Sequence, residues 1–263
     1  MKHIQKLICV LSVFLSAFVM SGCAEQTKKA RIGIIGAMDE EVATLKDALT
    51  DKKTTVIGGV EYCTGKLEGK DVVIVRCGVG KVNAGICTEH LINDFHADRV
   101  INTGVAGSLD ADIDIGDIVV STDVVQHDFD VTPLGFEPGE LYDLQMVGIP
   151  ADEKLRRNAV NAVTEAAPDV HVFEGRVLTG DQFIASKEKK NSLIENFGGM
   201  CCEMEGGAIA QVCCQNSVPF VIIRAISDKA DDSEEVSYNI FMKDAAEHCA
   251  AITRYMVAHI DES

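Results

Sequence analysis

The chain has no tryptophan and only four tyrosines among its 263 residues, so it has little material for the aromatic platforms on which nucleic-acid bases stack. Basic residues are also few, because 24 Lys and Arg stand against 41 Asp and Glu, a formal charge of −17. A surface of this charge repels a phosphate backbone. The composition therefore argues against a nucleic-acid partner, while its 47% hydrophobic content is sufficient for a globular core.

Common catalytic signatures are missing as well. The segment Gly78–Lys81 is followed by Val82, whereas a nucleotide-triphosphate loop requires Ser or Thr after Gly-Lys. No G-x-S-x-G serine hydrolase elbow occurs. The adjacent cysteine pairs lack the spacing of a zinc site, and alternation along a strand would separate His127 from Asp128 and Asp130. We therefore predict neither a metal nor a cofactor.

The amino terminus carries a long apolar run. Two lysines precede an apolar stretch from about residue 7 to 20, which ends shortly before Cys23. This pattern is typical of a secretory signal, and its ending is similar to a bacterial lipobox, in which Cys23 is lipidated. We predict a signal over 1–23, a tether over 24–30 and an exported lipoprotein anchored in the bacterial envelope. An ordinary signal peptide, an uncleaved anchor, or a cytoplasmic protein whose signal is not used are the alternatives.

Eight cysteines follow residue 23. An even number permits disulfides in an exported chain. Most of them lie within strongly apolar segments, which is typical of small buried thiols. We therefore predict that the cysteines are mostly free and buried.

Segments rich in Val and Ile alternate with helix-like segments along residues 31–263. The expected strands are 31–35, 72–77, 99–103, 117–125, 172–179 and 220–226, and the expected helices are 40–48, 82–94, 152–166, 186–196, 206–215 and 236–260. This alternation predicts one α/β domain whose central mixed, largely parallel sheet is covered by helices on both faces.

Glycine-rich or polar clusters lie at the ends of predicted strands or between them and the helices, at 36–41, 78–81, 102–107, 180–184, 203–207 and 227–228. Any one of them could be an ordinary turn. Ligands of such folds bind at the carboxyl edge of the sheet, so the shared position of the clusters predicts one site there.

Carboxylates on apolar walls are the most informative residues of these clusters. Glu203 and Glu205 flank Met204, and the R-A-I-S-D strand ends in Ser227 and Asp228. Buried carboxylates are costly without a partner, and their pKa values shift easily. Cleavage of a glycosyl bond uses such groups as acid and base. Each could instead be a helix cap or a salt-bridge partner.

Five segments carry a family resemblance. In chain order, IGIIGAMDEE, NTGVAG, TGDQFI, EMEGGAIAQV and VPFVIIRAISD resemble the 5′-methylthioadenosine/S-adenosylhomocysteine nucleosidases of the nucleoside phosphorylase superfamily, from about residue 31 to 258. The resemblance implies a nucleoside phosphorylase-like single domain that hydrolyses the bond between adenine and a 5′-thio-substituted ribose. It also implies that Asp228 is the general acid for the purine, that Glu41 binds and activates water, and that Glu205 holds the ribose hydroxyls.

The resemblance further implies how the substrate is surrounded. Phe183 would stack on adenine, the backbone of Ile184 would hydrogen-bond the edge of the base, and Met204 would pack against the sugar. Ser227 would help to hold the carboxyl group of the acid, and Arg224 would balance the charge of the carboxylates. The remaining implied substrate-binding residues are Glu203, Val105, Met38 and Val79.

A second subunit completes the pocket for the 5′-thio group in this family. The matching segment here contains Val131, Leu134 and Phe136, so the resemblance implies a homodimer. Two positions depart from the family pattern. Val105 replaces a serine of many relatives, which changes how water is placed, and Leu134 replaces an aromatic residue, which could alter the preferred 5′-thio group.

The glycine turn at 36–41 leads into acidic residues, and this bears on the type of reaction. A phosphorylase needs positive charge and N–H donors where phosphate meets the sugar, and a carboxylate there would repel the dianion. Water instead needs an acceptor for its proton. Glu41 therefore favours hydrolysis if it points into the pocket, and the helix N-terminus would favour its ionised form. Asp39 and Glu40 are expected to be capping or solvated.

Two other classes of function stay open. One is a related enzyme, such as a futalosine hydrolase, a phosphorylase or a nucleosidase that prefers another base. The other is an exported lipoprotein that binds nucleosides or host molecules. Loss of Glu41, Glu205 or Asp228 would favour this second class, and all three are present.

Overall fold

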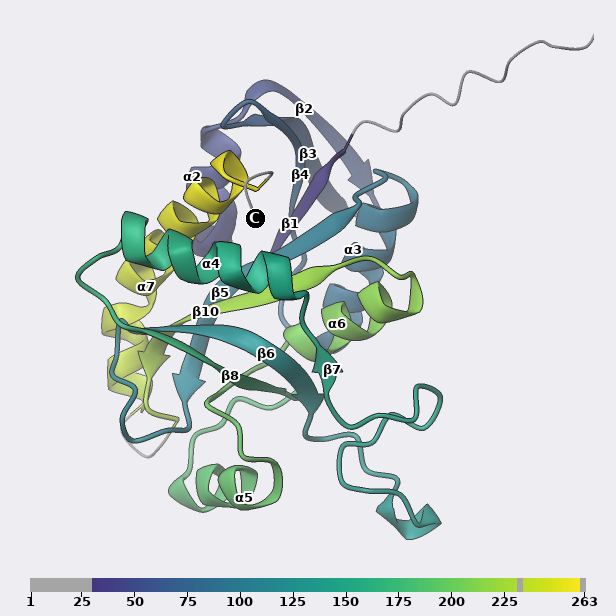
Figure 1. Ribbon diagram of the computed structural model, residues 1–263, viewed down its shortest axis with the longest axis vertical. Helices are drawn as coiled ribbons and strands as arrows, with labels where there is room; N and C mark the ends of the chain where they lie inside the picture. The colour runs from purple at the N-terminus through teal and green to yellow at the C-terminus, as the bar shows by residue number, and fades with distance from the viewer. Residues whose placement is uncertain (1–29, 231–233, 261–263) are drawn as a thin grey trace, which may run out of the picture.

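The computed structural model describes residues 30–230 and 234–260. Its centre is a sheet of strands with helices on either side (Figure 1). The predicted signal at 1–23, its Cys23 and nearly all of the tether at 24–30 lie outside the described residues. Within those residues, no helix is both long and apolar enough to cross a membrane.

The described residues form one sheet of ten strands. Five strand pairings are parallel and five are antiparallel. The predicted central mixed sheet is therefore confirmed, but the sheet is not largely parallel, because four of the antiparallel pairings involve strands that were not predicted. The strands are β1 (Ile32–Gly36), β2 (Thr50–Ile57), β3 (Val60–Leu67), β4 (Lys70–Arg76), β5 (Arg99–Ser108), β6 (Ile118–Gln126), β7 (Ile149–Pro150), β8 (Val172–Thr179), β9 (Cys201–Glu203) and β10 (Phe220–Asp228).

Five of these strands close into a ring. The order is β5–β9–β8–β6–β10, and β10 pairs with β5 again. Beyond the ring, β1, β4, β3 and β2 continue the sheet outward from β5. The closure gathers the carboxyl ends of β8, β9 and β10 at one rim, beside the ends of β1 and β5, and this rim carries the site described below.

Helices cover both faces of the sheet, as predicted. α2 (Asp39–Asp47), α4 (Glu153–Ala166) and α7 (Glu234–Ala258) lie on one side, and α3 (Lys81–Asn93) and α6 (Gly206–Gln215) lie on the other, while α5 (Lys187–Phe197) covers one end (Figure 1). Successive side chains of a strand point to opposite faces. Accordingly, Ile34 packs with α2 and α7, and its neighbour Ile35 packs with α3 and α6.

Local signals set the helix starts. The side chains of Asp152 and Ser186 accept hydrogen bonds from backbone N–H groups in the first turns of α4 and α5, which satisfies donors that otherwise have no partner. All six predicted helices are present, with bounds that differ from the predicted ones by at most two residues.

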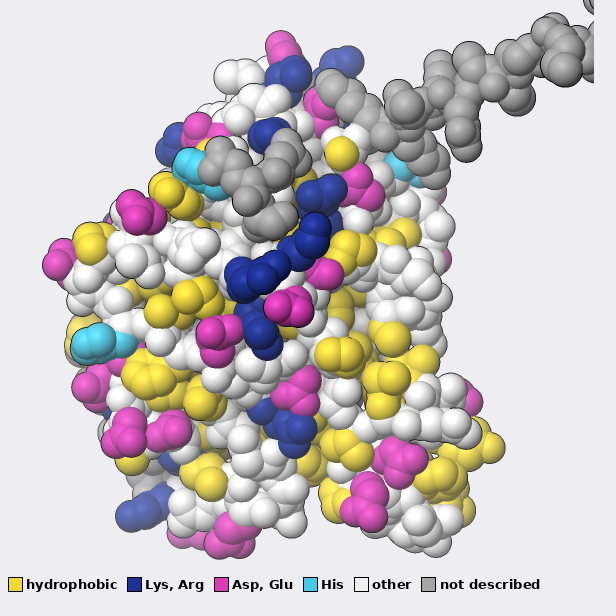
Figure 2. All heavy atoms as spheres, in the orientation of Figure 1, with side chains coloured by type: hydrophobic (Ala, Val, Ile, Leu, Met, Phe, Trp, Pro, Cys, Tyr) yellow, Lys and Arg dark blue, Asp and Glu magenta, His cyan; other side chains and the backbone are white. Residues whose placement is uncertain are grey.

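Four strands were not predicted: β2, β3, and the short β7 and β9. The hairpin of β2 and β3 spans residues 50–67, and the side chains of β2 are almost all exposed. An arm over residues 127–148 contains only a short 3-10 helix, η1 (Thr132–Leu134). Figure 2 shows this arm as a lobe at the lower right, with hydrophobic and acidic side chains at its surface.

Candidate active site

A cavity of about 380 Å³ lies at the carboxyl rim of the sheet. Each of the six predicted polar clusters contributes at least one residue to its lining. All twelve residues expected to be catalytic or substrate-binding line this cavity: Met38, Glu41, Val79, Val105, Phe183, Ile184, Glu203, Met204, Glu205, Arg224, Ser227 and Asp228. The fold therefore brings together side chains that are up to 190 residues apart in the chain.

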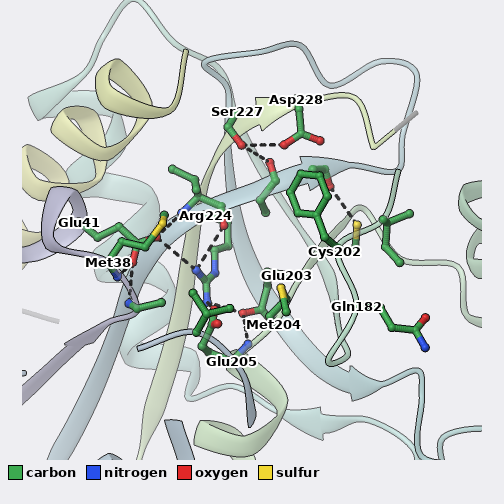
Figure 3. A pocket seen from close by; sticks show the side chains of 17 residues that line it. Met38, Glu41, Gln182, Cys202, Glu203, Met204, Glu205, Arg224, Ser227 and Asp228 are labelled. Carbon is green, nitrogen blue, oxygen red and sulfur yellow. Dashed lines mark hydrogen bonds and ion pairs between the residues drawn. The ribbon is translucent and has the colours of Figure 1, made fainter. Parts of the chain in front are cut away.

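Arg224 is the centre of the charged half of this cavity. Its side chain is only 1% exposed. One amino group, Nη2, donates to Asn102 Oδ1 at 2.6 Å and to Glu203, and lies 3.5 Å from Glu205 Oε2. Nη1 lies 4.0 Å from Glu41 Oε1. Figure 3 shows the three glutamates gathered around the guanidinium. Burial alone would lower the pKa of Arg224, but the three carboxylates raise it, so the side chain stays charged.

Glu41 is held by backbone donors. It is the third residue of α2, and its Oε2 accepts from the N–H groups of Ala37 at 2.6 Å and Met38 at 3.0 Å. Its Oε1 accepts from Val105 N–H at 3.1 Å. Burial raises the pKa of Glu41, although Arg224 and these donors oppose the shift. The donors at the helix N-terminus favour the ionised form, as predicted, but desolvation of a side chain that is only 1% exposed has the larger effect on the pKa of Glu41.

Asp39 and Glu40 are exposed, as expected. Asp39 pairs with Arg76 at 3.2 Å on the surface, so neither of these residues belongs to the cavity.

Glu205 and Glu203 differ in what holds them. Glu205 Oε1 accepts from Gly80 N–H at 2.8 Å, and burial raises the pKa of Glu205 to about 7. Both oxygens of Glu203 are occupied, because Oε2 accepts from Arg224 and from two backbone N–H groups at the start of α6, and Oε1 accepts from the Thr179 hydroxyl. Glu203 therefore anchors Arg224 and α6, while Glu205 is the group with free accepting capacity for a ligand.

Asp228 lies apart from these glutamates, at the upper edge of the cavity in Figure 3. Its Oδ2 accepts from the Ser227 hydroxyl at 2.8 Å and its Oδ1 from Ala230 N–H at 2.9 Å. The carboxyl group is only 3% exposed and has a fixed orientation. Acid and base candidates thus occupy different sides of one cavity, as a displacement at a sugar carbon requires.

Apolar side chains form the remaining walls. Phe183 and Val79 are about half exposed, at 55% and 50%, and lie at the mouth, whereas Val105 and Ile184 are buried. An aromatic ring and aliphatic walls beside a few fixed polar groups are typical of a small-molecule site.

Five lining residues were not predicted: Ala37, Ala106, Gly107, Gln182 and Cys202. They are direct neighbours of predicted residues. The side chains of Ala37, Ala106, Gly107 and Cys202 are small, and Gln182 is neutral, so none of them indicates acid–base chemistry. Burial raises the pKa of the Cys202 thiol well above its ordinary range, so this cysteine contributes packing and not a thiolate.

The expected partner-subunit residues lie elsewhere. Val131, Leu134 and Phe136 belong to the arm and do not line the cavity of this chain. Leu134 is 73% exposed, and Phe136 contacts Tyr142 edge to face, with ring centroids 5.1 Å apart. The arm therefore presents an apolar surface that its own chain leaves uncovered.

The described residues contain neither a disulfide nor a group of side chains arranged as metal ligands. Within residues 30–230 and 234–260, no three His, Cys, Asp or Glu side chains are grouped so that they could hold a metal ion. The eight cysteines predicted to be mostly free and buried are free, and all are buried except Cys214, which is partly exposed.

Comparison with known proteins agrees with the fold. A family model described as the phosphorylase superfamily matches residues 31–258. A curated 5′-methylthioadenosine/S-adenosylhomocysteine nucleosidase of Shewanella loihica is 44% identical over 234 residues, which cover 88% of this chain and 100% of the relative.

Two solved structures are also similar. The nucleosidase of this kind from Neisseria meningitidis, in complex with methylthio-immucillin-A, is 36% identical with a TM-score of 0.84, and the match covers 87% of this chain and 98% of the other. The nucleosidase from Colwellia psychrerythraea, in complex with adenine, is 39% identical with a TM-score of 0.84, and the match covers 88% and 95%.

Proposed function

This chain belongs to the 5′-methylthioadenosine/S-adenosylhomocysteine nucleosidases of the phosphorylase superfamily, and from that premise we propose how its cavity acts on the two nucleosides. It is an N-glycosyl hydrolase that releases adenine and the 5′-thio-substituted ribose. A cavity of about 380 Å³ with one aromatic residue at its mouth suits a nucleoside of this size.

The position of Glu41 is the observation that favours hydrolysis over phosphorolysis. The carboxylate lies in the cavity wall and is fixed by three backbone N–H groups, which in a phosphorylase would be available to an anion. Phosphate would meet a buried negative group there, whereas water finds an acceptor for its proton. The raised pKa of Glu41 also makes it a stronger base than an exposed carboxylate.

Asp228 acts as the general acid. Protonation of the imidazole-ring nitrogen of the purine makes the base a better leaving group, and the Ser227 and Ala230 contacts hold the carboxyl group in one orientation for that transfer. Ser227 is a positioning residue in this step. Phe183 and Ile184 hold the adenine.

Glu205 binds the ribose hydroxyls, and Met204 packs against the sugar. As the glycosyl bond breaks, positive charge develops on the ribose, and the surplus of carboxylates over the single Arg224 stabilises it. Because Val105 has no hydroxyl, its side chain cannot bind the water, and Glu41 takes that role.

The active form is a homodimer in which each subunit covers the mouth of its partner's pocket. The exposed arm with Leu134 supports this proposal, because an apolar side chain 73% exposed is suited to burial against another chain. Its Val131, Leu134 and Phe136 contact the 5′-thio group.

Residues 1–23 act as an export signal, and lipidation of Cys23 anchors the enzyme in the envelope. The support is the sequence pattern of positive charge, apolar run and lipobox-like ending. Metabolic labelling with a radioactive fatty acid tests it. Label on the wild-type chain and none on Cys23→Ser is the expected result, and label on both variants contradicts it.

Adenine release by the full chain tests the reaction. The substrates are methylthioadenosine, S-adenosylhomocysteine, adenosine and futalosine, each with and without phosphate. We expect phosphate-independent release of adenine from the two thio-nucleosides. Release that requires phosphate would make the chain a phosphorylase, and cleavage of futalosine alone would assign another substrate. No cleavage by a folded chain would support a binding role.

A further inference from the structure

The loop at residues 180–184 connects β8 to α5 and carries Phe183 and Ile184 at the mouth of the cavity. Most of its side chains are exposed. The position of such a loop depends on a few polar contacts of its backbone. Gly180 N–H donates to Glu203 O at 3.1 Å, and Asp181 N–H donates to Asp128 Oδ2 at 2.9 Å.

Asp128 connects this loop to the first residue of α3. Its other oxygen, Oδ1, accepts from Lys81 Nζ at 2.6 Å. The backbone of Lys81 is also bound to the loop, because Lys81 N–H donates to Asp181 Oδ1 at 2.8 Å. Three charged residues from three distant segments thus form a closed circuit around the base of the loop.

This circuit is partly buried and charged. The side chains of Lys81 and Asp128 are 18% and 16% exposed. Burial would raise the pKa of Asp128, but the Lys81 ammonium and the Asp181 N–H lower it, so the carboxylate is ionised at neutral pH. Charge-assisted hydrogen bonds of this kind are worth more than neutral ones.

His127 packs beneath the same loop. Its ring is 7% exposed, and neither ring nitrogen has a hydrogen-bond partner. A Cβ added at Gly180 would overlap the ring. Burial lowers the pKa of His127, so the neutral imidazole acts as an apolar support that limits how far the loop can move inward.

The residue before Lys81 belongs to the catalytic half of the cavity. Gly80 N–H donates to Glu205 Oε1 at 2.8 Å. Two adjacent residues at the start of α3 therefore hold a ribose-binding carboxylate on one side and the loop with Phe183 on the other. A shift of the loop at Asp181 would therefore change the distance between Phe183 and Glu205.

We propose that Lys81 and Asp128 are positioning residues that keep the base-binding loop at a fixed place relative to Glu205, and thereby set the affinity for the purine. The proposal rests on the proposed function, because it requires Phe183 and Ile184 to bind adenine. It gives a role to the G-V-G-K and H-D segments, which have neither phosphate-loop nor metal chemistry.

The test uses the purified full chain with Lys81→Met and Asp128→Asn. Equilibrium dialysis with labelled adenine gives the Kd, and adenine release from methylthioadenosine gives KM and kcat. We expect the Kd and KM to rise about tenfold, which corresponds to the loss of one charged hydrogen bond, and kcat to change less than about threefold. General damage would reduce the active fraction, which lowers kcat and leaves KM and the Kd of the remaining enzyme unchanged.

Matched variants distinguish the effect of losing the circuit from the effect of losing an unrelated ion pair. Lys81→Arg keeps the charge and should restore most of the affinity. The double variant Lys81→Met/Asp128→Asn should lose less affinity than the sum of the two single losses, because the bond between Lys81 Nζ and Asp128 is common to both, although Lys81 Nζ also donates to Gln126 Oε1 at 3.2 Å. Arg254→Met breaks an exposed pair with Glu68, 2.5 Å between Nη2 and Oε1, that has no part in this circuit, and should leave the Kd unchanged.

If the adenine Kd of the folded variants stays within twofold of wild type, the proposal is overturned. An equal rise of the adenine Kd in Arg254→Met also overturns it. If neither Lys81→Met nor Asp128→Asn folds, the exposed Asp181→Ala removes the bond from Lys81 N–H, and an unchanged Kd there overturns it as well. A wild-type chain that neither binds nor releases adenine overturns the proposed function. Active wild type with unaffected variants overturns only the role of the circuit.

Discussion

Replacing Gly104 by alanine should disable the enzyme without removing any functional group. Gly104 lies in β5 beneath the charged half of the cavity. An added Cβ would lie 2.5 Å from Glu41 Oε1 and closer still to Arg224 Nη1, where no carbon atom fits. The glycine is therefore required by the close approach of the buried Glu41 and Arg224 side chains to the strand.

Neither neighbour can withdraw at low cost. Glu41 is held by three backbone N–H groups, and Arg224 by Asn102 and Glu203. Overpacking of this kind costs about 1–3 kcal/mol, and breaking one charged hydrogen bond adds about 1.5–3 kcal/mol. We expect Gly104→Ala to lose about 3–5 kcal/mol of unfolding free energy and at least about 100-fold in kcat, because the general base moves.

Urea unfolding followed by circular dichroism measures the stability, since the chain has no tryptophan to report by fluorescence. Gly85→Ala is the matched control. Gly85 lies in α3, and a Cβ there would lie 3.9 Å from Val212 Cγ2, an ordinary contact. Alanine is the better helix former, so this variant should gain about 0.5–1 kcal/mol and keep full activity. Gly104→Ala with wild-type stability and turnover would refute the reasoning.

Asp228→Asn should lower turnover at least about 100-fold, while a nucleoside-analogue inhibitor still binds in calorimetry; near-normal turnover would remove Asp228 from the mechanism. Burial raises the pKa of Glu205 from 4.5 to about 7, so between these values the native state holds a proton that the unfolded chain has released. Its contribution to stability is complete below pH 4.5 and is lost as the pH rises through about 7. Glu205→Gln should remove that slope from urea titrations across pH, and an unchanged slope would contradict the assignment. Leu134→Asp on the arm should dissociate the dimer in sedimentation velocity and raise KM at least about fivefold; a monomer with wild-type KM would dismiss the role of the partner subunit.

The sequence predicts most of this fold because burial is periodic. Ile34 and Ile35 belong to opposite faces of one strand, and the apolar residues of α4 recur at helical spacing. The sequence does not predict β2, because its residues T-D-K-K-T-T-V-I are mostly polar and exposed to solvent. Its pairing with β3 therefore has no hydrophobic pattern in the sequence. Closure of the ring could not be predicted either, because it depends on β9, which is only three residues long.

The location of the site is predictable for a different reason. Strand ends meet at one rim, so Glu41, Glu205 and Asp228 are expected to line the same cavity. The pKa values of these carboxyl groups cannot be predicted from the order of the strands. The shift of Glu41 depends on how completely a whole domain removes it from water, and that exceeds the local effect of its helix.

Three carboxylates face one guanidinium in the core, and this imbalance has a consequence for how such a chain changes over generations. Burial already raises the pKa values of Glu41 and Glu205, so losing either glutamate would cost the fold less than losing Arg224, which would leave three buried anions unpaired. A lineage freed from selection for catalysis should therefore lose a glutamate first and the arginine last. Glu203 is kept by its contacts with Arg224 and the start of α6, whereas Glu41 and Glu205 are kept by the reaction, and their presence is a mark of continued use.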